Sequence, residues 1–301
     1  MPLVILGLAL LAASAAQAHD YSSLIVFGDS YSDSGAAHAI SVRGVEEGVP
    51  GAERVPSPLF WEGRWSNGPT AVEVLASRLD LKLDNHAVGG AMSGTGNANP
   101  SMDTFGGTGM LSQINVFLDV KGRLDPDALY VLFATTNDFL ATPTWPSDEA
   151  VRATADVAVA NQLQAIEQLH QGGARHIVLV GPIDLAQVPM VVRTGQSGQA
   201  VLFRDRVNDG LKRLVGERTA GDVLYFDHIA FSTPILATPQ HYGFENVTQP
   251  CIRSTAQDDQ PVCLRPDTYY FYDEVHPTAR VHQLTGEALA KAILAWKRKV
   301  R

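Results

Sequence analysis

The sequence predicts an α/β protein, a three-layer α/β/α sandwich built around a five-stranded parallel sheet. Short apolar runs that end in glycine or small polar residues are typical of buried parallel strands, and they alternate with longer stretches of helical periodicity. This alternation places the strands in one parallel sheet between two layers of helices. The expected strands are 24–27, 81–88, 128–134, 176–180 and 222–228.

The expected helices lie between and after these strands, at 70–79, 111–120, 149–171, 200–215 and 277–299. Each shows apolar residues at helical spacing, and the last is basic at its carboxyl end, which complements the helix dipole. Two long stretches, 36–68 and 229–272, lack such periodicity and are rich in glycine, proline or charge. We expect both to be irregular loops.

The amino terminus has the character of an export signal. Residues 3–16 are uncharged and apolar, and Ala16-Gln17-Ala18 is a small-x-small pattern that suits cleavage before His19, although the usual amino-terminal Lys or Arg is missing. The sequence therefore predicts a signal peptide at 1–18, one domain at 19–301, and a secreted or periplasmic location. The run is short for a membrane span, so no stable membrane anchor is expected.

The net charge limits the possible binding partners, and the cysteine content bears on the cellular compartment. The formal net charge of −9 argues against binding to nucleic acid and gives no attraction to anionic membranes. Cys251 and Cys263 are the two cysteines, and in an oxidising compartment they can close a small ring worth about 3 kcal/mol. The alternative is a pair of free buried thiols.

Candidate reactive side chains directly follow the first expected strand. The apolar residues 24–27 run directly into Gly28-Asp29-Ser30. The carboxyl ends of parallel strands border the crevice in which open α/β sheets bind ligands, so the Ser30 hydroxyl is placed to act as a nucleophile. The alternative is that Asp29 and Ser30 only cap the following helix.

Other segments supply the remaining parts of a nucleophilic site. Two later strands end in Gly89-Gly90 and near Asn137, and the segment before the last helix contains Asp273 and His276. A nucleophilic serine needs a base, an acid that orients the base, and donors aimed at the developing oxyanion. The spacing Asp-x-x-His allows one turn to present both side chains.

In these motifs the chain resembles the GDSL family of lipases and esterases, also called SGNH hydrolases, from Leu24 through the final helix. The matching segments are Phe27-Gly28-Asp29-Ser30, Asn85 to Ala91, Thr135-Thr136-Asn137-Asp138 and Asp273 to Thr278. The family usually has glycine where this chain has Thr135. Residues 64–69, Arg-Trp-Ser-Asn-Gly-Pro, are similar to a run in the larger members of the family.

The resemblance implies a flavodoxin-like SGNH hydrolase fold and a role for each motif residue. Ser30 is expected to be the nucleophile, His276 the base and Asp273 the residue that orients it. The oxyanion hole would consist of the Ser30 and Gly90 N–H groups and the Asn137 side chain. No cofactor is expected. No metal is expected either, because His-Glu-x-x-His and zinc-type cysteine spacing are absent.

The expected function is a secreted serine esterase or lipase that cleaves carboxylic esters through an acyl-enzyme. The alternatives are an acyltransferase with the same acyl-enzyme, a phospholipase, a carbohydrate acetylesterase, or a non-catalytic binding module. The partner would be a small-molecule or lipid ester, and we expect a preference for short to medium acyl chains. The sequence does not specify the oligomeric state.

Several further residues have two interpretations. Phe60, Trp61 and Trp65 either line a pocket for the substrate or fill a core. Asp138 is interpreted as a structural hydrogen-bond acceptor beside Asn137. His282 is interpreted as a surface or packing residue, and His38 has no predicted partner.

Overall fold

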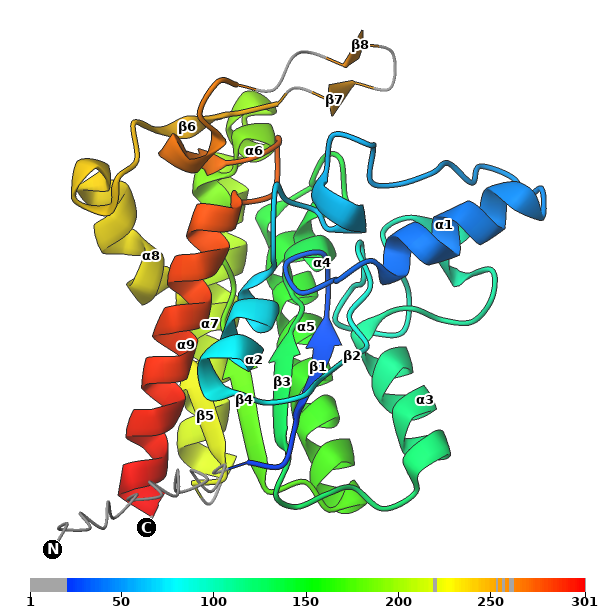
Figure 1. Ribbon diagram of the computed structural model, residues 1–301, viewed down its shortest axis with the longest axis vertical. Helices are drawn as coiled ribbons and strands as arrows, with labels where there is room; N and C mark the ends of the chain where they lie inside the picture. The colour runs from blue at the N-terminus through cyan, green and yellow to red at the C-terminus, as the bar shows by residue number, and fades with distance from the viewer. Residues whose placement is uncertain (1–20, 219–220, 253, 256–257, 260–262, 301) are drawn as a thin grey trace, which may run out of the picture.

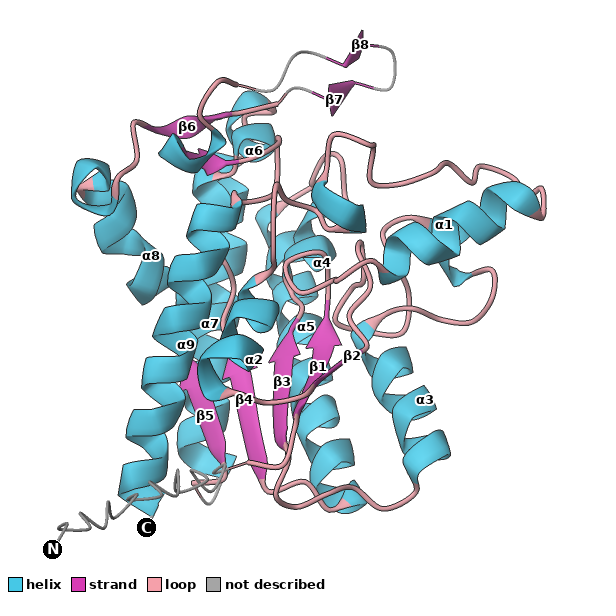
Figure 2. Cartoon of the chain, viewed as in Figure 1, coloured by secondary structure: helices cyan, strands magenta, loops and turns pink. Residues whose placement is uncertain are grey.

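A computed structural model describes residues 21–300 except 219–220, 253, 256–257 and 260–262. The predicted signal peptide at 1–18 lies outside these residues. The described chain has a central sheet of five parallel strands in the order β2-β1-β3-β4-β5, flanked on both faces by helices (Figures 1 and 2). This order is that of flavodoxin-like sheets, so the predicted fold class is confirmed.

The five strands of the sheet agree in number with the prediction. They are β1 (Leu24–Gly28), β2 (Leu83–Asn85), β3 (Leu129–Phe133), β4 (His176–Val180) and β5 (Val223–Phe226). β1 and β3 are buried along their whole length and pair in register from Leu24 with Leu129 to Gly28 with Phe133. Burial on both faces explains why these strands are continuous apolar runs rather than alternating ones.

β2 is shorter than the predicted strand at 81–88. The backbone of this segment still bonds to β1, because His86 N–H donates to Val26 O and Val88 N–H donates to Gly28 O. Between them, Ala87 N–H donates to the Asn85 side-chain oxygen at 3.1 Å. Because β2 is the edge strand, this side chain satisfies an N–H group for which the described sheet has no further strand.

The principal helices cover the two faces of the sheet. α2 (Ala71–Leu79) and α9 (Ala279–Val300) pack together on one face. α3 (Met110–Lys121), α5 (Asp148–Gly172) and α7 (Ser197–Arg218) lie on the other (Figure 1). Their ends are chemically defined: α2 has a capping box of Thr70 and Glu73, and α5 ends at Gly173, whose φ is +117°. No helix within the described residues is long and apolar enough to cross a bilayer.

The structure corrects the prediction that 36–68 and 229–272 are irregular. Residues 36–46 form α1 (Ala36–Glu46), which begins where the Asp33 carboxylate accepts the N–H groups of Gly35, Ala36 and Ala37. Residues 228–237 form α8 (His228–Ala237), which is capped by Asp227 and contains Pro234. His228, predicted to end the fifth strand, is therefore the first residue of a helix.

The remaining short elements lie mostly beyond the carboxyl ends of the strands. They are α4 (Thr136–Leu140), α6 (Pro189–Arg193), β6 (Asn246–Pro250), β7 (Ser254–Thr255), β8 (Asp258–Asp259), β9 (Tyr269–Phe271) and 3-10 turns at Trp61–Gly63, Pro100–Asp103, Leu185–Gln187, Pro239–Tyr242 and Pro266–Thr268. β6 pairs with β9 in a separate two-stranded sheet.

Cys251 and Cys263 form a disulfide in this upper region, with their Cα atoms 5.0 Å apart. Cys251 is buried in a small apolar cluster with Phe60, Ile252 and Tyr272. The disulfide therefore ties the segment after β6 to a core that also contains a residue adjacent to Asp273.

Candidate active site

The first part of the site is the turn that follows β1. Gln113 holds the strand end from α3, because its Oε1 accepts Gly28 N–H and its Nε2 donates to Gly28 O, both at 2.9 Å. A Cβ on Gly28 would lie 2.6 Å from Phe133 O, so only glycine allows β1 and β3 to approach this closely. Ser30 then stands directly above the carboxyl edge of the sheet, with 6% of its surface exposed.

The second part is the turn at 273–276, before α9. The Asp273 carboxylate accepts Val275 N–H and His276 N–H through Oδ1, and its Oδ2 lies 2.8 Å from His276 Nδ1. His276 Nε2 lies 2.9 Å from Ser30 Oγ. Because the carboxylate accepts from Nδ1–H, Nε2 is left to accept from the serine hydroxyl. The predicted residues Ser30, His276 and Asp273 therefore meet in one hydrogen-bonded chain.

Electrostatics favour an ionised carboxylate at Asp273. Burial raises the pKa of this group, but the charge of His276 and hydrogen bonds from His276 and Val275 outweigh burial, so the pKa lies below its usual value. A carboxylate in this state can stabilise positive charge on the adjacent imidazole.

The third part is the turn at Gly89-Gly90. Gly89 N–H donates to Asp33 Oδ2 at 2.7 Å, so this amide is already occupied. Gly90 has a φ of +81°, a conformation that favours glycine, and a Cβ there would lie 2.3 Å from Asn97 Oδ1. These contacts leave Gly90, rather than Gly89, as the candidate oxyanion donor in this turn.

Asn137 lies at the start of α4, after β3. Its Nδ2 donates to Ala91 O at 3.0 Å, which fixes the amide beside the Gly89-Gly90 turn. Its neighbour Asp138 accepts Ser93 N–H at 2.9 Å and Ser93 Oγ–H at 2.6 Å. Asp138 is thus a structural acceptor, as interpreted from the sequence, and burial raises its pKa to about 6 against the effect of the Ser93 hydrogen bonds.

Two residues that hold the site were not identified from the sequence. Asp33 joins the start of α1 to Gly89, and Gln113 joins α3 to the end of β1. Asp33 comes three residues after Ser30 and precedes Ser34-Gly35, a pattern typical of a helix cap that could have been recognised. Gln113 offers no such signal, because its partner is 85 residues away.

The three aromatic residues of the 36–68 segment have different environments. Phe60 is buried and packs edge-on against Tyr272, so it fills a small core. Trp61 is 36% exposed, and its ring lies under the Arg64 guanidinium. Trp65 lies against the imidazole of His276, with ring centroids 5.0 Å apart.

The structure also gives defined contacts to His282 and His38, the two histidines whose roles the sequence did not specify. His282 is a buried packing residue rather than a surface one: its Nδ1 accepts Ala71 N–H, and its ring is edge-on to Tyr31. Burial lowers its pKa to about 3, with smaller contributions from His276 and His228. His38 is exposed but has a partner, because its Nδ1 lies 3.2 Å from Val55 O.

Asp29 is a buried carboxyl group beside Ser30. Its Oδ1 accepts Tyr31 N–H at 3.0 Å, and burial raises its pKa to about 7. Tyr31 in turn donates its hydroxyl to Val275 O at 3.1 Å. The residue after Ser30 is thus bonded directly to the turn that carries His276.

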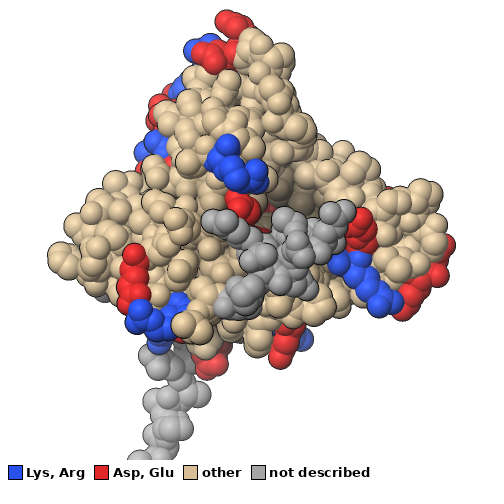
Figure 3. All heavy atoms as spheres, turned by 90° about the horizontal axis from the view of Figure 1, so that it is seen from above, with Lys and Arg blue, Asp and Glu red and all other residues tan. Residues whose placement is uncertain are grey.

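The described residues that are visible on the face above the strand ends are mostly uncharged. Figure 3 looks down on this face, and Lys, Arg, Asp and Glu occupy separate small groups among uncharged residues. Within the described residues, no group of three His, Cys, Asp or Glu side chains is placed to hold a metal ion.

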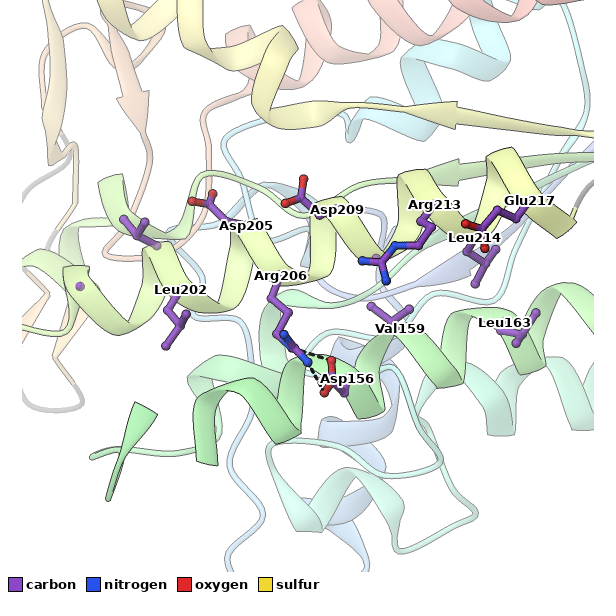
Figure 4. A pocket seen from close by; sticks show the side chains of 13 residues that line it. Asp156, Val159, Leu163, Leu202, Asp205, Arg206, Asp209, Arg213, Leu214 and Glu217 are labelled. Atoms are coloured by element: carbon purple, nitrogen blue, oxygen red, sulfur yellow. Dashed lines mark hydrogen bonds and ion pairs between the residues drawn. The ribbon is translucent and has the colours of Figure 1, made fainter. Parts of the chain in front are cut away.

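A groove of about 650 Å³ lies elsewhere, between α5 and α7 (Figure 4). Apolar residues such as Val159 and Leu202 line it beside the paired Arg206 and Asp156 side chains, whose Nε and Oδ1 atoms are 2.6 Å apart. It contains none of the predicted site residues, so it is a surface groove between helices and not part of this site.

A flavodoxin-like sheet with a hydrogen-bonded serine, histidine and aspartate at its carboxyl edge is the arrangement of a serine ester hydrolase. Comparison with known proteins agrees and is more specific. The chain belongs to the GDSL-like lipase/acylhydrolase family, whose family model matches residues 24–289.

Individual relatives are distant. The chain is 28% identical over 312 residues to an uncharacterized protein of the trpE-trpG intergenic region of Pseudomonas putida, with 95% of this chain aligned but only 51% of the relative. It therefore spans about half the length of that protein. It is 26% identical to the phosphatidylcholine-sterol acyltransferase of Aeromonas hydrophila, with 96% of this chain and 95% of the relative aligned.

Among solved structures, a carbohydrate acetylesterase family member from Sinorhizobium meliloti is similar in fold. The TM-score is 0.49 at 15% sequence identity, and the alignment covers 91% of this chain and 98% of that one.

Proposed function

We propose that this chain is a secreted serine ester hydrolase in which Ser30, His276 and Asp273 form the catalytic triad. The observation that carries the proposal is the continuous path from Asp273 Oδ2 through His276 to Ser30 Oγ, with heavy-atom distances of 2.8 and 2.9 Å. Both lie within the range that proton transfer between such groups requires.

The chemistry follows from these contacts. His276 Nε2 takes the Ser30 proton as Oγ attacks the ester carbonyl, and the resulting imidazolium returns the proton to the leaving alcohol. His276 then deprotonates a water molecule, which attacks the acyl-enzyme and releases the acid. In both steps the oxyanion would accept hydrogen bonds from Ser30 N–H, Gly90 N–H and Asn137 Nδ2, donors that are held in place before substrate binds.

Replacement of the nucleophile tests this proposal. Ser30→Ala should abolish hydrolysis of p-nitrophenyl esters while the melting temperature stays near that of the wild type. A matched control is Ser22→Ala, because Ser22 precedes the other end of β1 and its hydroxyl donates to Asp125. Turnover that survives in Ser30→Ala would refute the assignment.

The second candidate function is acyl transfer by the same acyl-enzyme. The observation that favours it is the similarity, along almost the whole of both chains, to a relative named as a phosphatidylcholine-sterol acyltransferase. Product analysis with both water and an alcohol present separates the two functions, because a hydrolase should give mainly the free acid. Transesterified product in excess would favour the transferase.

We propose carboxylic esters of short to medium acyl chain as substrates. The mostly uncharged face above the strand ends suits a neutral ester (Figure 3). The test is an activity profile across p-nitrophenyl esters of increasing acyl length, run beside a phospholipid and an acetylated sugar. Highest activity on the phospholipid would indicate a phospholipase, and activity confined to the sugar would indicate a carbohydrate acetylesterase.

We also propose that residues 1–18 are removed on export and that 19–301 form one domain. The apolar run at 3–16 and the Ala16-Gln17-Ala18 pattern support cleavage, and a main core that includes both Tyr21 and Ile293 supports one domain. Mass spectrometry of the exported protein should find His19 at the amino terminus. A retained apolar segment would contradict this.

A further inference from the structure

The segment at 64–67 contacts the turn that carries His276. Ser66 Oγ donates to Pro277 O at 2.8 Å, and Ala279 N–H donates to Asn67 Oδ1 at 2.8 Å. These two hydrogen bonds bind the segment to the residues that follow His276, although more than 200 residues separate the partners in sequence. The catalytic assignment of the site does not explain these contacts.

Trp65 immediately precedes the two hydrogen-bonded residues in sequence, and its side chain contacts the site. Its ring lies beside the imidazole of His276 at a tilt of 34°, with the two ring centroids 5.0 Å apart. On another side the indole lies against Gly89, where an added Cβ would be 2.2 Å from Nε1. One side chain thus fills the space between His276 and the turn that presents Gly90.

The position of Trp65 is itself fixed by neighbours. Phe60 packs edge-on against it at 6.0 Å and also against Tyr272, whose hydroxyl donates to Leu59 O. The preceding residue, Arg64, forms a part-buried ion pair with Glu73, in which Nη2 and Oε1 are 2.7 Å apart. The indole therefore offers a rigid surface to His276 rather than a mobile one.

We propose that Trp65 is a positioning residue that acts through His276: its indole keeps the imidazole in line with Ser30 and stabilises the imidazolium formed during acyl transfer. The inference rests on the proposed roles of Ser30 and His276. A cation is attracted to the face of an aromatic ring, and tryptophan is the most effective partner. Because the Ser30 proton passes to His276 as the ester is attacked, this attraction strengthens toward the transition state.

The other ring close to His276 makes a weaker candidate for this role. Tyr31 lies 6.2 Å from the imidazole at an angle of 46°, farther away and more inclined than Trp65. Its hydroxyl is already used in the bond to Val275 O. The ring of Trp65 is therefore the one that we expect to stabilise the charged imidazole.

Three variants test the proposal. Trp65→Leu keeps the site apolar but removes the aromatic face, whereas Trp65→Phe keeps an aromatic face. The Trp65 indole N–H is buried and makes no hydrogen bond to the described residues, so its loss in the Phe variant should not cost stability. Trp61→Leu is the matched control, because Trp61 lies four residues earlier and packs under Arg64.

The measurements are kcat, KM and melting temperature for p-nitrophenyl ester hydrolysis. We expect Trp65→Leu to lower kcat about 3- to 30-fold with KM nearly unchanged, and Trp65→Phe to recover most of that loss. Trp61→Leu should match the wild type. A merely structural Trp65 would instead lower the melting temperature and affect the Leu and Phe variants alike.

The outcomes separate this inference from the proposed function. If the wild type hydrolyses esters in a Ser30-dependent manner but Trp65→Leu retains full kcat, the inference alone is overturned. The same holds if Trp65→Leu raises KM and leaves kcat intact, because Trp65 would then contact substrate. A wild type without Ser30-dependent hydrolysis overturns both.

Discussion

The Nε2 atom of His276 lies 2.9 Å from the Oγ atom of Ser30, although 246 residues separate the two in sequence. Ser30 follows the first strand and His276 precedes the last helix, so it is the tertiary fold that brings these atoms together. Activity is for this reason expected to depend on the complete fold, and the predictions below pair kinetic measurements with stability measurements.

The proposed oxyanion hole predicts the effect of losing Asn137. Asn137→Ala removes a donor aimed at the developing negative charge, so kcat should fall about 10²- to 10³-fold while KM changes little. The variant also leaves Ala91 O without this partner, so unfolding should be monitored to keep the assay below the melting transition. Asn115→Ala, a change on the exposed surface of α3, is the control variant and should leave kcat unchanged. A loss of less than 10-fold in Asn137→Ala would assign the third donor to another group.

His282 predicts a specific form of acid sensitivity. Burial lowers its pKa to about 3 in the folded chain, whereas a histidine in an unfolded chain has a pKa near 6.5. Between these values the unfolded chain binds a proton that the folded chain does not, so this contribution to stability is complete above pH 6.5 and is lost progressively toward pH 3.

At pH 5 this loss amounts to about 2 kcal/mol. His282→Asn should remove it, because the Asn Oδ1 can still accept Ala71 N–H but has no proton to gain. Urea unfolding at pH 7 and pH 5 should therefore show a smaller drop in stability for His282→Asn than for the wild type. His38→Asn, the same change at an exposed histidine, is the control variant for this comparison of stability at the two pH values. Equal drops in the wild type and His282→Asn would show that His282 does not titrate in this way.

The disulfide predicts a change in substrate binding rather than in chemistry. Cys251 N–H donates to Phe271 O, and Cys251 packs against Phe60 and Tyr272, so the bridge orders the segment before the turn at 273–276 but does not belong to that turn. Reduction should lower stability by about 3 kcal/mol and raise KM more than it lowers kcat.

A variant with both cysteines replaced by serine should show the same kinetics and be insensitive to reductant. If mass spectrometry of the exported protein finds both thiols free, or if reduction lowers kcat and leaves KM unchanged, this account of the bridge fails.

Much of the fold was predictable because its buried strands leave a clear pattern in the sequence. β1 and β3 are buried on both faces, which requires continuous apolar runs, and their turns require glycine or small polar residues. α1 was missed because its buried positions are the small residues Ala37, Ser41 and Gly44, which leave no apolar periodicity in the sequence. α8 was missed because it contains Pro234, usually a sign that a helix has ended.

The site was predictable only where its residues belong to local motifs. Short sequence motifs identify the candidate residues, and the fold brings these motifs together. The residues are Ser30, Gly90, Asn137, Asp273 and His276. The contacts of Trp65 with His276 and of Gln113 with Gly28 join segments far apart in the chain. Periodicity and spacing describe neighbours along the chain, so they carry no information about such contacts.

The most direct test of the central claim is to identify the residue that carries the acyl group during turnover. A reaction with p-nitrophenyl acetate should be quenched in acid within the first turnovers, digested, and analysed by peptide mass spectrometry. We expect an acetyl group on Ser30, with no such adduct in Ser30→Ala and none formed at an appreciable rate in His276→Ala. An acetyl group found reproducibly on a different residue during turnover, with Ser30 unmodified, would contradict the account.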